Sequence, residues 1–396
     1  MSTLPLAGIR VLDLSTVLAA PVTATFLGDF GAEVVKVEDP GRGDFTRGTT
    51  PGARSPYWAQ EARNKKSVTL DLRTEAGQQI VRRLVPNFDV VITNYRPPTL
   101  EAWGLDPDTL RELAPDTVLV YVTGYGLTGP YSDRGSFDRI ASAFAGLTYV
   151  TGDEDRPPLR SGYSTIDYMA AYLGAFSVVT ALYHRDTAGG GGQVIDLALY
   201  EAGFRASEDA LAAYATTGKV RERLGNRNPQ IVPASDFTTS DGRRVSIHAG
   251  TDALFGRLAG AMGRPELATD PSYATRAARV EHANTLYAVI ANWAGGYAAD
   301  EVTKLLSDAG IPASPLMSIA DIAADAHYRE RGTLVTVADP DFGPLPMVAP
   351  LPKMSKTPGS IRSTGPALGE HNTEVYAGVL GLDEGELAAL RADGVI

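Results

Sequence analysis

Asp167 is the residue of this sequence best placed to do chemistry. It follows the polar turn 153–158 and lies just before the apolar segment Met169–Tyr183, at or near the start of an expected helix. There the free backbone N–H groups and the positive end of the helix dipole favour an ionised carboxylate. Such a carboxylate can act as a nucleophile or a base, and it can equally serve as the N-cap of the helix.

The composition leaves few other candidates for catalysis. The 396 residues include no cysteine, which excludes disulfides, thiolate nucleophiles and Cys-ligated metals. There is no Gly-x-Ser-x-Gly elbow, and the five histidines are scattered, so no metal site is expected. A net charge of −11 argues against nucleic acid as a partner. No signal segment or membrane-length apolar run is found, so we expect a cytoplasmic protein without a membrane partner.

The elements that must position Asp167 are expected in the first half of the chain, where strands and helices alternate. Continuous apolar runs such as 89–93 and 118–122 are typical of strands buried on both faces of a parallel sheet. The pattern predicts an α/β, Rossmann-like fold. Because no Gly-x-Gly-x-x-Gly follows a strand, an NAD-dependent enzyme is a weak alternative. Strands are expected at 9–14, 33–37, 67–72, 89–93, 118–122 and 193–197, and helices at 21–30, 74–84, 169–183 and 200–214.

Ligands of such sheets bind beyond the carboxyl ends of the strands. The segments 15–21, 94–97 and 123–126 follow strands there, and their small, polar or glycine residues let a ligand approach the backbone. Cations are also expected near this edge, which favours a phosphate-bearing ligand in an otherwise acidic protein. They are Lys65, Lys66, Arg73, Arg96, Arg134 and Arg139.

A change of composition near residue 217 predicts a division into domains. The large α/β domain is expected to consist of an N-terminal part, 1–216, and a C-terminal part, 333–396, that returns to it. Between them we expect a linker at 217–233, a smaller α+β domain at 234–320 and a second linker at 321–332. The small domain should contain a hairpin turned at 240–242, followed by helices at 251–262, 276–293 and 299–309.

A series of short motifs runs through almost the whole chain. They are Leu6–Leu14, Ala20-Pro21, Leu27–Glu38, Gly43-Asp44, Asn64–Ser67, Leu70–Arg73, Asn94–Pro97, Gly126–Tyr131, Gly310–Pro312 and Leu368–Asn372. In this order they resemble the motifs of the family III CoA-transferases, a group that includes formyl-CoA transferases and is related to α-methylacyl-CoA racemases.

The resemblance implies an enzyme that moves CoA from an acyl-CoA thioester to a free carboxylic acid. Acyl-CoA and CoA would be substrates, with no permanently bound cofactor. The resemblance also implies an interlocked homodimer, and that Asp167 accepts the acyl group as a mixed anhydride and then carries CoA as a thioester. The residues that it assigns to acyl-CoA are Val17, Leu18, Ala19, Leu70, Arg73, Asn94, Tyr95, Arg96, Tyr125, Phe137 and Asp138.

Two alternatives remain open on the residues. A racemase of the related group uses a histidine besides the aspartate, and the matching position here holds Phe137, which cannot carry a proton. The second alternative is a catalytically silent acyl-CoA-binding protein, against which the retained Asp167 argues. Since Val17 and Leu18 are apolar where some relatives have a polar pair, we expect the acid to be less polar than oxalate.

Overall fold

The computed structural model describes residues 4–48 and 54–396, which fall into two compact units. The first unit contains the described residues of 1–147 together with 160–211 and 327–396. The second unit contains 148–159 and 212–326. The segment 148–159, which the sequence analysis assigns to the large domain, groups with the second unit.

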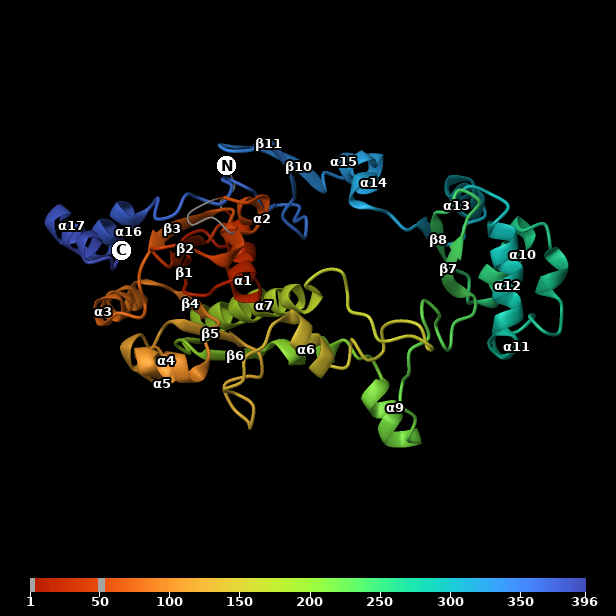
Figure 1. Cartoon of the computed structure of the whole chain (residues 1–396), viewed down its shortest axis with the longest axis horizontal. Helices are drawn as coiled ribbons and strands as arrows, with labels where there is room; N and C mark the ends of the chain where they lie inside the picture. The colour runs from red at the N-terminus through yellow and green to blue at the C-terminus, as the bar shows by residue number, and fades with distance from the viewer. Residues whose placement is uncertain (1–3, 49–53) are drawn as a thin grey trace. The chain divides into compact units, whose positions relative to one another are not determined.

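A six-stranded parallel sheet forms the centre of the first unit (Figure 1). The strand order is β3-β2-β1-β4-β5-β6, the order of doubly wound dinucleotide-binding folds. Val11 of β1 lies opposite Val34 of β2 on one side and Val90 of β4 on the other, so the order reverses between β1 and β4. The prediction of a parallel α/β sheet is confirmed. The strands are β1 (Arg10–Asp13), β2 (Glu33–Glu38), β3 (Lys65–Thr69), β4 (Val90–Thr93), β5 (Val118–Thr123) and β6 (Val194–Ala198).

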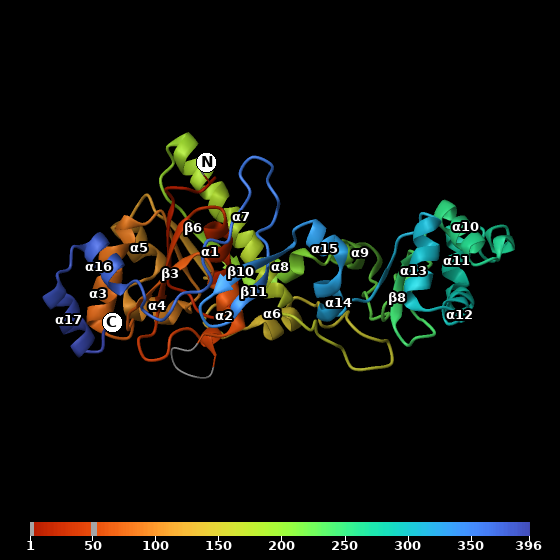
Figure 2. The same ribbon diagram turned by 90° about the horizontal axis from the view of Figure 1, so that it is seen from above.

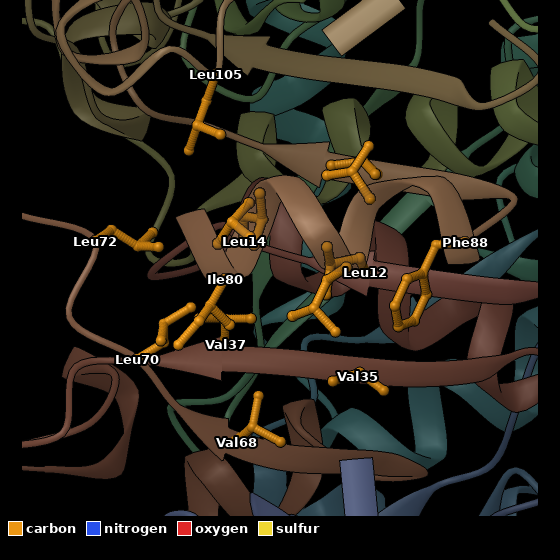
Figure 3. Close-up of a cluster of buried hydrophobic side chains, with 14 of the residues drawn as sticks. Leu12, Leu14, Val35, Val37, Val68, Leu70, Leu72, Ile80, Phe88 and Leu105 are labelled. Carbon is orange, nitrogen blue, oxygen red and sulfur yellow. The ribbon is translucent and has the colours of Figure 1, made fainter. Parts of the chain in front are cut away.

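Helices cover both faces of this sheet. The six residues of β5 are all buried, and the first five divide alternately between two hydrophobic cores. Leu119 and Tyr121 belong to the core that contains α3 and α16, whereas Val118 and Val120 belong to the core that contains α1 and α7. Figure 3 shows the first of these cores, which gathers side chains from neighbouring strands. Burial on both faces explains why these strands are continuously apolar.

The helices of the first unit confirm most of the expected ranges. They are α1 (Ala19–Asp29), α2 (Pro56–Glu61), α3 (Glu75–Leu84), α4 (Pro97–Trp103), α5 (Pro107–Leu113), α6 (Asp138–Phe144), α7 (Thr165–Ala188), α8 (Leu199–Arg205), α16 (Asn372–Leu380) and α17 (Glu384–Ala392). The single helix expected at 200–214 is wrong, because the chain forms α8 and then α9 (Ala210–Thr217). Between them Glu208 has a φ of 55°, a left-handed conformation that interrupts a helix.

The C-terminal segment covers the free edge of β3. His371 donates its backbone N–H to the carbonyl of Ser67 and accepts the Ser67 N–H on Nδ1. Asn372 accepts the N–H of Thr69 and donates to its hydroxyl, at 2.8 and 2.7 Å. These contacts pair backbone groups that an edge strand otherwise leaves open. The hairpin of β10 (Leu334–Asp339) and β11 (Gly343–Val348) precedes this segment.

The second unit is a small α+β fold. Its sheet has the antiparallel order β7-β8-β9, and its core includes Phe237, Ile247 and Leu286. One helix was expected at 276–293, but two form, with a break at His282. Two short helices also occupy much of the expected linker at 321–332. The elements are β7 (Ala234–Thr238), β8 (Arg244–His248), β9 (Ala313–Pro315), α10 (Asp252–Ala261), α11 (Arg276–Glu281), α12 (Ala283–Ala294), α13 (Ala299–Asp308) and α14 (Ile319–Ala324). Helix α15 (Ala326–Glu330) begins at the boundary between the units, and its residues from His327 onward belong to the first unit.

Helix α7 is the one described helix whose length and composition would allow it to cross a membrane. This differs from the expectation that the chain has no such segment. Core helices pass the same test, and Ile166, Ala170 and Val178 of α7 are buried in the core that contains α1. Figure 2 shows α7 lying along the sheet from a second direction.

Candidate functional site

A cavity of about 570 Å³ lies beyond the carboxyl ends of β1, β4 and β5, where the strand order reverses. We call it the large cavity. Parallel α/β sheets bind their ligands at this position. Its walls include eight residues predicted from the sequence, which come from four different parts of the chain. They are Val17, Leu18, Ala19, Asn94, Tyr95, Arg96, Phe137 and Asp167.

Asp167 is the third residue of α7 and is about nine-tenths buried. In the described part of the chain, no group hydrogen-bonds its side-chain carboxylate. Burial, and then the nearby Asp138, raise the pKa of Asp167 to about 7. The helix start was expected to keep this carboxylate charged at neutral pH, but burial outweighs the helix dipole and leaves the carboxylate only partly ionised there.

Asp138 holds the start of α7 in place. Its Oδ2 accepts the backbone N–H of Ile166 at 2.9 Å, so a residue of α6 satisfies one of the open N–H groups of α7. This bond brings the Asp138 carboxylate to the turn that carries Asp167. The capping role considered for Asp167 thus belongs to Asp138, and the Asp167 carboxylate remains open to the cavity.

The loop after β1 forms another wall of the large cavity and is held by two side chains. The amide of Asn94 accepts the N–H of Thr16 at 2.9 Å and donates to its carbonyl at 2.7 Å. Asp44 accepts the N–H of Val17 at 3.2 Å. Val17 has a φ of 69°, which is strained for a β-branched residue and persists only where the surroundings enforce it. Asn94 is therefore a positioning residue for the loop.

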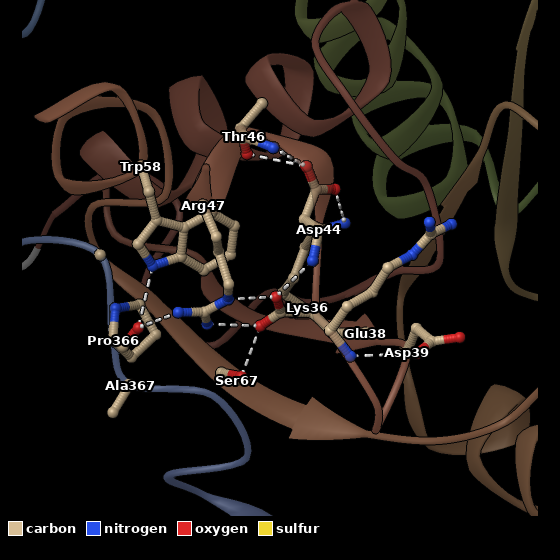
Figure 4. Close-up of polar contacts among 12 residues, drawn as sticks. Lys36, Glu38, Asp39, Asp44, Thr46, Arg47, Trp58, Ser67, Pro366 and Ala367 are labelled. Carbon is tan, nitrogen blue, oxygen red and sulfur yellow. Dashed lines mark hydrogen bonds and ion pairs between the residues drawn. The ribbon is translucent and has the colours of Figure 1, made fainter. Parts of the chain in front are cut away.

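Asp44 is anchored in turn by a buried lysine, as Figure 4 shows. Lys36 Nζ lies 3.4 Å from Asp44 and 3.8 Å from Asp13, and all three side chains are almost fully buried. Burial opposes the charge of Asp44, but Lys36 and hydrogen bonds from Thr46 and Val17 outweigh it and hold the pKa of Asp44 below its ordinary value. The network fixes the charge that orients the Val17 N–H.

A second buried ion pair stands beside this network. Arg47 contacts both carboxylate oxygens of Glu38, at 2.6 and 2.8 Å, and its guanidinium lies 3.8 Å from the centre of the Trp58 ring (Figure 4). Arg47 and Trp58 both donate to the carbonyl of Pro366, at 3.1 and 2.8 Å. The C-terminal segment is thereby tied to the segment that carries Asp44.

A smaller cavity of about 230 Å³ lies next to the large one, beyond the ends of β2 and β3. We call it the small cavity, and its walls include the predicted residues Leu70, Arg73 and Tyr95. Arg73 already contacts two carboxylates, Asp71 at 2.7 Å and Asp39 at 2.9 Å. A phosphate that approaches Arg73 must compete with both.

A third cavity, of about 540 Å³, also reaches Asp167, and we call it the outer cavity. Its walls are apolar at Val17, Leu18 and Phe137, and the Phe137 side chain is 69% exposed. The remaining walls carry hydroxyl, acidic and basic groups. They are Thr46, Tyr57, Asp138, Arg139, Arg160, Ser164 and Asp167, and Phe45 adds one more apolar side chain to the wall.

Three sequence predictions are not met. Tyr125 is absent from the walls of the three described cavities, and its ring lies 5.1 Å from that of Phe144 in an aromatic cluster. Lys65 is buried against Asp13 at 2.9 Å, and Lys66 pairs with Glu33 at 2.7 Å. Both lysines begin β3, so they lie at its amino end and not at the ligand edge.

Sequence reasoning missed the roles of Lys36 and Asp44. A signal was available for Lys36, because a lysine inside an apolar strand that is buried on both faces requires a buried carboxylate partner. Asp44 was visible only as part of the Gly43-Asp44 motif, and its contact with Val17 joins residues 27 positions apart. Contacts of this kind depend on the fold.

Comparison with known proteins identifies relatives over the whole chain. The model of CoA-transferase family III matches residues 6–372. The chain is 44% identical over 396 residues to a succinyl-CoA–D-citramalate CoA-transferase of Chloroflexus aurantiacus, covering 99% of this chain and 98% of that protein. It is 45% identical over 401 residues to the beta subunit of a succinyl-CoA–L-malate CoA-transferase of the same organism, covering 100% and 99%. The crystal structure of a CAIB/BAIF family protein from Brucella suis superposes with a TM-score of 0.84 at 33% identity, over 96% of this chain and 100% of that one.

Proposed function

The chain belongs to CoA-transferase family III, and from this premise we propose that it moves CoA from an acyl-CoA thioester to a free carboxylic acid through covalent intermediates on Asp167. The observation that carries the proposal is the Asp167 carboxylate, which lines two cavities and has no hydrogen-bond partner in the described chain. A carboxylate without such partners is available to attack a substrate carbonyl.

The steps exchange one thioester for another. The Asp167 carboxylate attacks the donor thioester carbonyl, the C–S bond breaks, and CoA leaves as a thiolate while a mixed anhydride forms. The thiolate attacks the aspartyl carbonyl, which releases the donor acid and leaves an aspartyl-CoA thioester. The acceptor carboxylate displaces CoA to form a second anhydride, and the thiolate attacks its acyl carbonyl. The new acyl-CoA leaves, and the Asp167 carboxylate is restored.

The surroundings of Asp167 suit a reactive anhydride. Burial strips water from the carboxylate and protects an anhydride from hydrolysis. The apolar side chains of Val17, Leu18 and Phe137 border the same space. A pKa of about 7 still leaves a large ionised fraction of Asp167 at neutral pH.

Phe137 favours transfer over racemisation. A racemase needs a second proton carrier on the opposite side of the substrate carbon. Phe137 lines both cavities that reach Asp167 and has no titratable group. Deuterium exchange from solvent into the α-carbon of the acyl group is therefore not expected.

We further propose that the acids exchanged are dicarboxylic acids longer than oxalate. The two relatives named above are a succinyl-CoA–D-citramalate and a succinyl-CoA–L-malate transferase. The apolar Val17 and Leu18 support a longer acid, because they offer contact to a carbon chain between two carboxyl groups.

The proposal extends to a cytoplasmic homodimer. Four apolar or aromatic side chains, Tyr172, Phe176, Val179 and Tyr183, follow one another along α7 and are between 45% and 70% exposed. A stripe of this kind is typical of a surface that another chain covers. Light scattering at several protein concentrations tests this point, and a monomer at all of them would contradict it.

The central test compares wild type with Asp167→Ala and Asp167→Asn. Wild type, incubated with succinyl-CoA, should yield an aspartyl hydroxamate at residue 167 when hydroxylamine is added, detected by mass spectrometry. Both variants should bind CoA but transfer none. Transfer at the wild-type rate by either variant would remove Asp167 from the mechanism.

A further inference from the structure

Two arginines at the outer cavity have no assigned role. Resting on the proposed transfer of CoA between acids, we propose that Arg139 and Arg160 bind the distal carboxylate of a dicarboxylic substrate and so determine which acids are accepted. Both line the cavity that contains Asp167. They come from different elements, since Arg139 lies in the first turn of α6 and Arg160 precedes α7.

Several other cations near the site are already paired with carboxylates. Lys36 is paired with Asp13 and Asp44, Arg47 with Glu38, and Arg73 with Asp71 and Asp39. These ion pairs neutralise the charges of Lys36, Arg47 and Arg73 within the protein. Such cations hold the fold and offer little to a ligand. Two arginines of the large cavity, Arg96 and Arg134, form no ion pair within the described residues but have other contacts: Arg96 donates to the carbonyl of Asp133 at 3.3 Å, and the Arg134 guanidinium lies 3.7 Å from the centre of the Tyr131 ring.

Arg139 and Arg160 differ from these in having no partner. Neither guanidinium group forms an ion pair or hydrogen bond with any residue in 4–48 and 54–396. The carboxylates that share their cavity do not engage them either, because Asp138 accepts the N–H of Ile166 and no ion pair reaches Asp167. In a protein of net charge −11, two unpaired guanidinium groups on the wall of one cavity favour an anionic ligand.

The remaining walls select the kind of anion. Val17, Leu18 and Phe137 are apolar and suit a short hydrocarbon chain. Asp167 marks the position of the reacting carboxyl group. An acid that reacts at Asp167 and carries a second carboxylate can thus satisfy both the apolar wall and the arginines. A monocarboxylic acid of equal length would leave the two cations unpaired beside its apolar end.

The test uses glutarate and valerate, two five-carbon acids that differ by one carboxylate. Because the donor leaves before the acceptor binds, kcat/KM for the acceptor is independent of the donor. Arg139→Gln and Arg160→Gln should each lower kcat/KM for glutarate by about tenfold, the effect of losing one charge-assisted hydrogen bond, and leave that for valerate unchanged. The double variant should lose more than either. Arg111→Gln, an exposed arginine on α5, is the matched control and should change neither value.

Equal losses of kcat/KM for glutarate and for valerate would overturn the assignment. A loss confined to kcat/KM for acetyl-CoA would also overturn it, because the arginines would then bind CoA. Calorimetric titration of the intact proteins with each acid separates this inference from the proposed function. Tighter binding of glutarate than valerate, abolished in the double variant, would support the inference even if no transfer occurred. Equal binding of both acids by wild type would refute it.

Discussion

Asp167→Asn should make the protein more stable at pH 8, although it removes the proposed nucleophile. The pKa of Asp167 rises from its ordinary value of 3.8 to about 7 in the folded protein, chiefly because the carboxylate is buried. The folded chain therefore binds the proton more tightly than the unfolded chain. The stability contributed by this group is complete below pH 3.8 and is lost as the pH rises through about 7.

The size of the effect follows from the same shift. At about 1.4 kcal/mol for each pH unit, ionised Asp167 lowers the free energy of unfolding by about 4 kcal/mol above pH 7. The asparagine side chain has the same shape as aspartate and cannot ionise, but burying its amide lowers the free energy of unfolding by about 1 kcal/mol. We therefore expect Asp167→Asn to be about 3 kcal/mol more stable than wild type at pH 8, with no such advantage at pH 4.

Urea titration measures the difference. A Trp293→Phe background leaves Trp58 and Trp103 as the fluorescent reporters, both of which belong to the first unit. Asp108→Asn, at an exposed aspartate in the first turn of α5, is the control and should show no pH-dependent gain. Equal stability of wild type and Asp167→Asn at pH 8 would refute the reasoning that burial dominates the environment of Asp167.

Two further predictions concern the reaction and its loop. Only ionised Asp167 attacks the thioester, so kcat/KM for the acyl-CoA donor should fall about tenfold per pH unit below pH 7 and level off above it. A flat pH profile of kcat/KM between pH 5 and 8 would contradict this expectation. Asn94→Ala removes both hydrogen bonds to Thr16. It should lower the free energy of unfolding by about 1–3 kcal/mol and raise KM for acyl-CoA. Unchanged steady-state kinetics would show that the loop holds its shape without Asn94.

The sheet was predictable because its signal is local. Each strand is a short apolar run, and runs buried on both faces indicate a parallel sheet with helices on either side. The break between α8 and α9 was not predictable, because the left-handed φ of Glu208 has no sequence signature. The cover of the β3 edge by His371 and Asn372 also escaped prediction, because it joins side chains to strand backbone more than 300 positions away.

The candidate site also contains features that the sequence could predict and features that it could not. Asp167 and the segments after β1 and β4 were predicted from residue type and position. Their environment was not, because it depends on neighbours supplied by the fold. Arg73 was expected to meet phosphate, yet Asp39 and Asp71 contact it first. Such contacts cannot be read from the spacing of charges.

The stability lost at Asp167 and the strain at Val17 have a common explanation. A carboxylate in water is well solvated and a poor nucleophile toward a thioester, whereas a buried one has lost that solvation before the substrate arrives. Asp138 takes over the cap of α7, so Asp167 need not bond to the helix start. Asp44 and Asn94 hold the Val17 loop against its preferred conformation, which keeps an apolar wall beside the carboxylate. The stability of the surrounding fold thus offsets the free energy lost by burying the Asp167 carboxylate, which CoA transfer requires to be poorly solvated.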